Sequence, residues 1–284
     1  MKNILEAKIG FGTYKILDQN KMNDAIKWAS LAGYDFIDTA KLYQTEELIA
    51  NAIKKIKIEA PEIKIPMLQS KIWPSDFKNG VRNEMLASFK RLGGIKEIDA
   101  FLLHRPHVNN DMNVKAWKEL IECKKEGLVK HIGLSNFEPD MIRILYNETG
   151  IMPELLNNEA SVTYIRKDRI IHAKKHNIVL QGWRPFGDPV FNFKSPLLME
   201  MASKYNCTMA QIMVAYSKSF GFAPVPRSDI ESEIFDNILG LKIDLDKKDV
   251  TLIEATLNRH ESTTHNKCDS YANLALNDDW YKNN

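Results

Sequence analysis

The chain has 284 residues, 44% hydrophobic and 27% charged, which excludes wholesale disorder and collagen-like repeats. Its 39 lysines and arginines nearly balance 37 aspartates and glutamates, so the net charge of +2 predicts no broad basic surface for nucleic acid or an anionic membrane. Three cysteines far apart in sequence, Cys123, Cys207 and Cys268, argue against a disulfide framework or a clustered zinc site.

Eight short segments combine β-branched and apolar residues with turn formers at their ends, a pattern typical of strands. In chain order they cover residues 9–14, 35–40, 66–73, 98–105, 130–137, 154–161, 177–186 and 223–228. Helix-period stretches lie between them, and the spacing of about 30 residues suits repeated strand–helix units. We therefore predict an α/β fold, a parallel eight-stranded (β/α)8 TIM barrel, as a single domain over residues 1–284.

Local signals refine this prediction. An apolar helical face runs from Met22 to Ala32, with Gly33 as its expected stop, and the pairs Thr208/Gln211 and Ser228/Glu231 resemble capping boxes. An open dinucleotide-binding sheet is disfavoured because the first strand lacks the third glycine of Gly-x-Gly-x-x-Gly. Residues 187–195 form a candidate lid, and the polar tail at 259–284 is expected to cover the carboxyl-end face of the barrel.

Reactive residues of such a barrel gather at the carboxyl ends of the strands, where all the loops face one mouth. Asp38, Lys71 and His104 close the second, third and fourth predicted strands, and Tyr43 follows in the loop after Asp38. Each alone has an ordinary structural explanation, such as a helix cap or a solvated charge. Together they form a set that can handle protons, which indicates a catalytic site.

The chemistry of this set is specific. A phenol with a pKa of about 10 is a poor acid near neutrality, but a neighbouring ammonium favours its ionised form. Lys71 can supply that ammonium, and Asp38 can keep the buried lysine charged. With His104 holding the substrate oxygen, Tyr43 can donate a proton to an oxygen that is becoming an alkoxide.

Five ordered motifs that contain these residues resemble the aldo-keto reductase family. They are Gly10-Phe11-Gly12-Thr13-Tyr14, Gly33-Tyr34-Asp35-Phe36-Ile37-Asp38-Thr39-Ala40 with Tyr43, Ser70-Lys71-Ile72-Trp73, Leu103-His104-Arg105-Pro106 and Ile132-Gly133-Leu134-Ser135-Asn136-Phe137. The resemblance implies an NAD(P)H-dependent oxidoreductase that reduces aldehydes or ketones to alcohols. It assigns catalysis to Asp38, Tyr43, Lys71 and His104.

The resemblance also implies NADP(H) as cofactor, with NAD(H) as the alternative. Ser135 and Asn136 match the pair that holds the nicotinamide carboxamide, and Asn157, or else Asn158, stands where the family has a glutamine. Trp183 would stack on the nicotinamide. The full expected cofactor set is Gly12, Thr13, Asp38, Ser135, Asn136, Asn157, Trp183, Arg227, Ser228 and Asn237.

The motif around the ribose phosphate departs from the family pattern. Pro226-Arg227-Ser228 replaces Pro-Lys-Ser, and Glu233 stands where an arginine is usual, with Asp229 adding a second carboxylate. Arg227 favours a 2′-phosphate, whereas acids repel it and suit a free 2′-hydroxyl. We expect the protein to use both cofactors, with a narrow preference for NADPH.

The substrate is expected to be a small carbonyl compound held by Tyr14, Tyr43, Trp73, His104 and Arg105, with His107, Phe191 and Phe193 as further candidates. Rival hypotheses are a catalytically silent cofactor-binding regulatory protein and a barrel lyase or isomerase. No metal-site motif occurs. The amino terminus has no apolar signal region and no long apolar run follows, so a cytoplasmic location is expected; oligomeric state is left open.

Overall fold

The computed structural model describes residues 3–258 and contains eight parallel strands in one sheet, paired in chain order. The strands are β1 (Gly10–Gly12), β2 (Phe36–Asp38), β3 (Met67–Ile72), β4 (Ile98–Leu103), β5 (Val129–Ser135), β6 (Leu155–Glu159), β7 (Val179–Trp183) and β8 (Phe222–Val225). The Gly12 amide donates to the Pro226 carbonyl at 2.9 Å, joining the first strand to the segment after the last. The predicted (β/α)8 barrel is confirmed.

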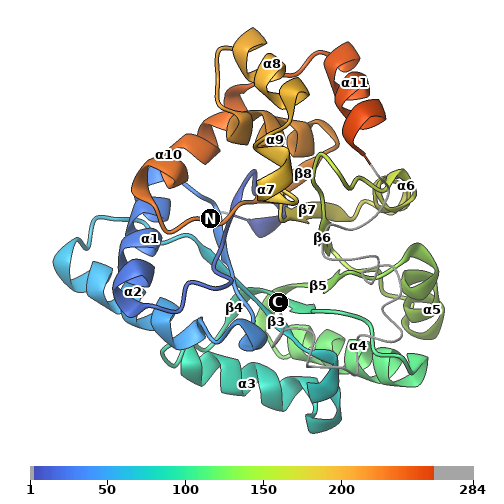
Figure 1. The fold of residues 1–284 in the computed structure, drawn as a ribbon. Helices are drawn as coiled ribbons and strands as arrows, with labels where there is room; N and C mark the ends of the chain where they lie inside the picture. The colour runs from blue at the N-terminus through green and yellow to red at the C-terminus, as the bar shows by residue number, and fades with distance from the viewer. Residues whose placement is uncertain (1–2, 259–284) are drawn as a thin grey trace.

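Helices form a ring outside the strands (Figure 1). The α-helices are α1 (Gln19–Ala32), α2 (Glu46–Glu59), α3 (Val81–Arg91), α4 (Asn110–Lys125), α5 (Pro139–Thr149), α6 (Lys167–Lys175), α7 (Pro189–Asn192), α8 (Pro196–Lys204), α9 (Met209–Ser219), α10 (Glu231–Leu239) and α11 (Lys247–Leu257). Short 3-10 helices are η1 (Ile4–Glu6), η2 (Lys41–Tyr43), η3 (Pro74–Asn79) and η4 (Gly240–Lys242). None of the helices in the described part of the chain is long and apolar enough to cross a membrane.

Side chains inside the barrel change character along each strand. One buried cluster contains Ile4 from η1 together with strand residues Phe36, Ala100, Leu102, Leu155 and Val225. Side chains alternate between the two faces of a strand, so residues two apart share a face. Asp38 lies two residues after Phe36, and His104 lies two residues after Leu102. The apolar layer therefore closes the lower barrel, and the polar residues lie above it at the carboxyl ends.

Two of the local predictions are confirmed and one is wrong. Gly33 ends α1 in the left-handed conformation with φ 93°, which glycine adopts without steric penalty. Thr208 and Gln211 form the predicted capping box at α9. Ser228 does not cap a helix with Glu231, because α10 begins at Glu231 and the Ser228 hydroxyl instead donates to Glu233 Oε2 at 2.6 Å.

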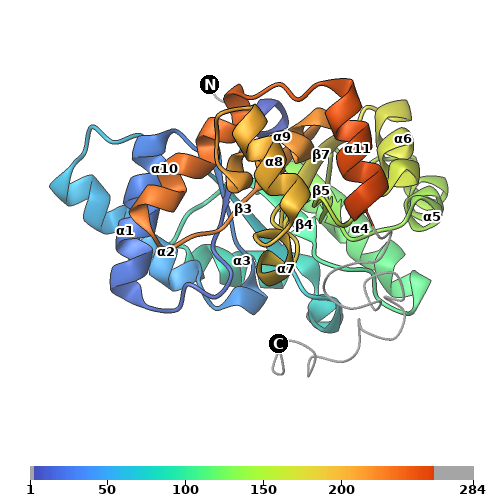
Figure 2. The same cartoon turned by 45° about the horizontal axis from the view of Figure 1, so that its top comes forward.

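The segment 187–195 contains α7, which lies below α8 in Figure 2. The Asp188 side chain accepts a hydrogen bond from the Phe191 amide and so caps this short helix. Two further helices, α8 and α9, follow before β8. The expected polar tail at 259–284, including Cys268, lies outside the described residues.

Gly133→Ala is expected to destabilise the barrel. A Cβ at Gly133 in β5 would lie 2.7 Å from the Leu155 carbonyl oxygen and 2.8 Å from the Leu155 Cβ on neighbouring β6. Overpacking against backbone of this kind typically costs about 1–3 kcal/mol. The midpoint of urea unfolding should therefore fall, and a variant with the wild-type midpoint would show that β5 and β6 can separate without strain.

Candidate active site

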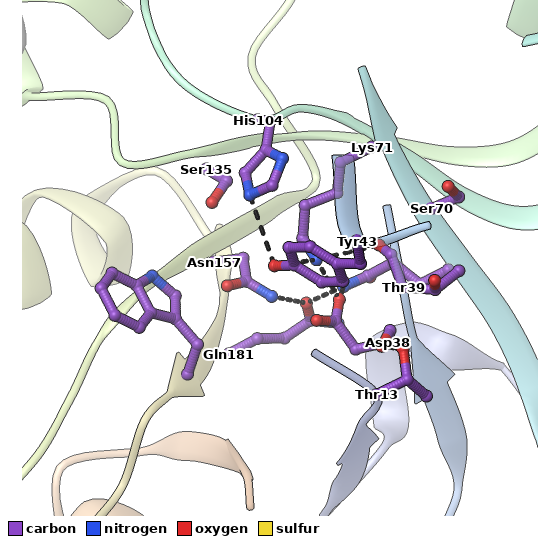
Figure 3. A network of polar contacts seen from close by, with 12 residues as sticks. Thr13, Asp38, Thr39, Tyr43, Ser70, Lys71, His104, Ser135, Asn157 and Gln181 are labelled. Carbon is purple, nitrogen blue, oxygen red and sulfur yellow. Dashed lines mark hydrogen bonds and ion pairs between the residues drawn. The ribbon is translucent and has the colours of Figure 1, made fainter. Parts of the chain in front are cut away.

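The four expected catalytic residues meet at the carboxyl ends of β2, β3 and β4 (Figure 3). The Lys71 Nζ lies 2.6 Å from Asp38 Oδ1 and also donates to the Thr39 carbonyl at 3.1 Å. The Tyr43 hydroxyl, from η2, is 3.5 Å from that ammonium and 3.3 Å from His104 Nε2. The arrangement joins a carboxylate, an ammonium, a phenol and an imidazole in one continuous set of polar contacts.

Burial determines the charge state of this set. His104 is 4% exposed, and burial, followed by the charges of Lys71 and Arg105, holds the pKa of its imidazole well below the usual 6.5. Its ring is therefore neutral at pH 7. Burial also lowers the pKa of Lys71, and the Asp38 carboxylate opposes that shift. The ion pair thus keeps a positive charge beside the phenol in a place where a lone lysine would lose its proton more readily.

A cavity of about 1190 Å³ opens beside this set. The lining residues come from strand ends and the loops after them, the 183–193 segment, the start of α9 and one face of α10. Those that the sequence predicts for catalysis, cofactor or substrate are Gly12, Thr13, Tyr14, Asp38, Tyr43, His104, Arg105, Ser135, Asn136, Asn157, Trp183, Phe193, Arg227, Glu233 and Asn237. One site therefore collects most of the residues that the motifs single out.

The part of the cavity where the nicotinamide is expected is built around Asn136, which has a positive φ of 64°. Its amide nitrogen donates to the His104 carbonyl at 3.0 Å and to Ser135 Oγ at 2.9 Å, and its oxygen accepts from Trp183 Nε1 at 3.1 Å. Asn157 lines the cavity, and its Oδ1 is buried without a hydrogen-bond partner among the described residues. Asn158 instead accepts from the Asn136 backbone amide. An unpartnered acceptor on a residue that lines the cavity fits a carboxamide, which supplies N–H donors.

The residues expected at the ribose lie on the segment that follows β8 and on α10. Arg227 is exposed at the rim, whereas Ser228 is buried and donates to Glu233. Asp229 is held by Lys21 of α1 at 2.7 Å, and this bond lowers the pKa of its carboxyl. The serine hydroxyl is thus already committed to a carboxylate that itself lines the cavity.

The expected substrate residues divide into two groups. The Tyr14 ring lies 5.1 Å from the Tyr43 ring, and both line the cavity with Arg105 and Phe193. Trp73 is only 3% exposed and does not line the cavity; its indole packs edge-on against His104 at 5.1 Å. His107 and Phe191 also lie outside the lining. Trp73 therefore supports the imidazole from behind.

Sequence reasoning missed two fully buried glutamines in the barrel interior. The Gln69 amide nitrogen donates to Asp38 Oδ1 and to Gln181 Oε1, both at 2.8 Å. Gln69 lies two residues before Lys71 on β3, and Gln181 two before Trp183 on β7. The signal available in the sequence is a long polar residue in an apolar strand, on the same face as a site residue.

Comparison with known proteins bears on this site directly. Residues 8–258 match the aldo/keto reductase family. The chain belongs to that family. Curated relatives include methylglyoxal reductase DkgA of Escherichia coli, 32% identical over 248 residues and 86% of each chain, and glyoxal reductase of Bacillus subtilis, 27% identical over 254 residues and 89% of each chain.

Solved structures of aldo-keto reductases agree with this membership. The Brucella melitensis aldo/keto reductase is 28% identical, with a TM-score of 0.79 over 87% of this chain and 92% of that one. The Bombyx mori aldo-keto reductase in complex with NADP is 25% identical, with a TM-score of 0.81 over 90% of each chain. This aldo-keto reductase is thus an NAD(P)H-dependent oxidoreductase acting on carbonyl compounds, as the motifs predict.

Proposed function

We propose that Tyr43 is the general acid of this aldo-keto reductase and that Asp38, Lys71 and His104 set its reactivity. The observation that carries the proposal is the position of the Tyr43 hydroxyl, at the cavity and within 3.5 Å of both Lys71 Nζ and His104 Nε2. The ammonium stabilises the phenolate that remains once the proton has left. Asp38 holds the ammonium in place, at 2.6 Å.

The neutral imidazole of His104 would orient the substrate carbonyl beside the phenol. Because its pKa is held low, Nε2 does not compete with Tyr43 as a charged acid near pH 7. Tyr43 then transfers its proton to the carbonyl oxygen, which becomes the hydroxyl oxygen of the alcohol product. Trp73 keeps the imidazole oriented through its edge-on contact.

The cavity also suits the cofactor. Ser135, Asn136 and Asn157 would hold the carboxamide and Trp183 the ring face, with Gly12, Thr13, Arg227 and Asn237 toward the ribose. Ser228 does not line the cavity and would act there through Glu233, to which it donates. Bound NAD(P)H supplies a hydride to the carbonyl carbon. The protein's own contribution is to orient both partners and to place the phenolic proton.

We infer that the substrates are small aldehydes and dicarbonyls of the methylglyoxal and glyoxal type, which the names of the similar reductases specify. The aromatic wall of Tyr14, Tyr43 and Phe193 suits such compact, uncharged molecules. We also propose that the protein is a single domain over residues 1–284 and that it acts in the cytoplasm. The test is oxidation of NADPH, followed at 340 nm, with methylglyoxal and a simple unactivated aldehyde. Saturable oxidation supports the proposal, and bound cofactor that survives excess aldehyde contradicts it.

Cofactor preference should respond to Glu233. In the wild type we expect both dinucleotides to be used, with a modest lead for NADPH, because Arg227 and Glu233 act in opposite directions on a 2′-phosphate. Glu233→Arg removes the repulsion, frees Ser228 and adds a cation, so the NADPH/NADH ratio of kcat/KM should rise about 10- to 100-fold. Equilibrium Kd values for NADP⁺ and NAD⁺ should show the same selective change.

Glu231→Arg is the matched control for this substitution. It makes the same charge change in the first turn of α10, but Glu231 does not line the cavity. The wild type could instead prefer NADPH by several powers of ten, and the two substitutions could change the NADPH/NADH ratio equally. That result would show that Glu233 lies away from the bound ribose.

A further inference from the structure

Three buried amides form a row across the inside of the barrel. Asn157 Nδ2 on β6 donates to Gln181 Oε1 on β7 at 3.1 Å, and Gln69 Nε2 on β3 donates to the same oxygen at 2.8 Å. Gln69 Nε2 also donates to Asp38 Oδ1, which accepts from Lys71 as well. All three amides are 0% exposed, and of the three residues Asn157 is the one that lines the cavity. Figure 3 shows Asn157 and Gln181 joined below the Tyr43 ring.

Hydrogen-bond chemistry orients this row from one end. The Asp38 carboxylate paired with Lys71 only accepts, so the Gln69 side chain must turn its NH₂ group toward it. The remaining hydrogen on the same nitrogen reaches Gln181 Oε1, which therefore has to be an oxygen. Since that oxygen faces Asn157 as well, Asn157 must present its nitrogen to Gln181. Each amide then keeps one buried polar atom without a partner among the described residues: Gln69 Oε1, Gln181 Nε2 and Asn157 Oδ1. Only the Asn157 atom belongs to a residue that lines the cavity.

We propose that Gln69 and Gln181 are positioning residues that carry the polarity of Asp38 across the barrel and so aim the Asn157 oxygen at the cofactor. The inference deepens the proposed function and rests on it, because the carboxamide NH₂ is the donor that would meet this oxygen. An asparagine amide rotates easily between its two orientations. Without Gln181 the NH₂ group could face the cavity, where it would oppose another NH₂ group.

The test compares two oxidised cofactors that differ only at this contact. NADP⁺ carries the carboxamide, and its 3-acetylpyridine analogue has a methyl group in place of the amide NH₂. Kd values come from quenching of tryptophan fluorescence, so no turnover is needed. One neutral hydrogen bond should make wild-type protein bind NADP⁺ about two- to tenfold more tightly than the analogue. Gln181→Met and Gln69→Met should bring this ratio close to one.

Two further variants separate orientation from general damage. Gln181→Glu keeps an oxygen acceptor between Gln69 and Asn157 and should retain the wild-type ratio. Gln211→Met removes another buried glutamine amide, one that bonds Asp236 at the far end of the cavity, and should leave the ratio unchanged even if both affinities fall. Circular dichroism checks folding, and if Gln181→Met fails to fold, Gln69→Met decides.

The outcomes distinguish the inference from the proposal beneath it. Wild-type protein that binds neither dinucleotide contradicts the proposed function. Binding with a wild-type ratio of one, or with a ratio that survives in both methionine variants, overturns the inference alone. Loss of the ratio in Gln181→Met but not in Gln69→Met overturns the link to Asp38, because Gln181 would then orient Asn157 by itself.

Discussion

Tyr43→Phe is expected to lower kcat about 10²- to 10⁴-fold, the usual contribution of a positioned general acid. The substitution removes one hydroxyl and keeps the ring, so packing against Tyr14 and His104 persists. The Kd for NADPH should stay close to the wild-type value, because no hydrogen bond to the expected carboxamide residues is lost. Steady-state kinetics with methylglyoxal and fluorescence titration with NADPH measure the two quantities separately.

Tyr146→Phe on α5 is the control for this loss of a hydroxyl, since Tyr146 is 42% exposed and far from the cavity lining. It should behave as wild type. A Tyr43→Phe enzyme that retains most of the wild-type rate on an unactivated aldehyde would assign the proton to another donor.

Lys71→Met is expected to abolish most activity and to weaken the fold. The variant deletes the ammonium beside the phenol and leaves the buried Asp38 carboxylate without its ion-pair partner. Removing one member of a buried pair typically costs about 3–5 kcal/mol, and the Gln69 hydrogen bond to Asp38 should keep the loss at the lower end. Activity and urea unfolding test the two effects.

The dependence of kcat on pH tests the role of the Lys71 ammonium more specifically than the loss of activity does. Burial lowers its pKa, so as pH rises the wild-type enzyme should lose the ammonium, and with it kcat, below the pH at which a free lysine titrates. That alkaline fall should be absent in the residual activity of Lys71→Met. Lys78→Met, an exposed lysine in η3, should keep both the rate and the profile. An active Lys71→Met enzyme with an unchanged profile would contradict the role of the ammonium.

Much of the barrel and its mouth could be predicted because the signals are local. Alternation along each strand fixes which residues point inward. Asp38, Lys71 and His104 each lie within one residue of a strand's carboxyl end, so a parallel barrel gathers them at one rim. Thr208 starts α9 through the short-range hydrogen bonds of its capping box. Gly33 ends α1 because glycine adopts the left-handed backbone conformation freely.

Contacts across the barrel could not be predicted in this way. Gln69 and Gln181 are 112 residues apart and meet only because β3 and β7 face one another over the barrel interior. Ser228 has three possible carboxylate partners within five residues, Asp229, Glu231 and Glu233, and the turn before α10 selects Glu233 over the expected Glu231. Trp73 was expected in the pocket, but its strand end turns the indole behind His104. Each outcome depends on three-dimensional placement that sequence spacing does not encode.

The most direct measurement of the central claim is a single-turnover experiment with enzyme in excess over NADPH, started with methylglyoxal and followed at 340 nm in wild type and Tyr43→Phe. Excess enzyme removes product release from the observed rate, so the chemical step is read directly. The geometry around Tyr43 predicts complete oxidation of the bound NADPH by wild type, and a rate about 10²-fold or more lower in the variant. Equal rates in the two proteins, or bound NADPH that wild type fails to oxidise, would contradict it.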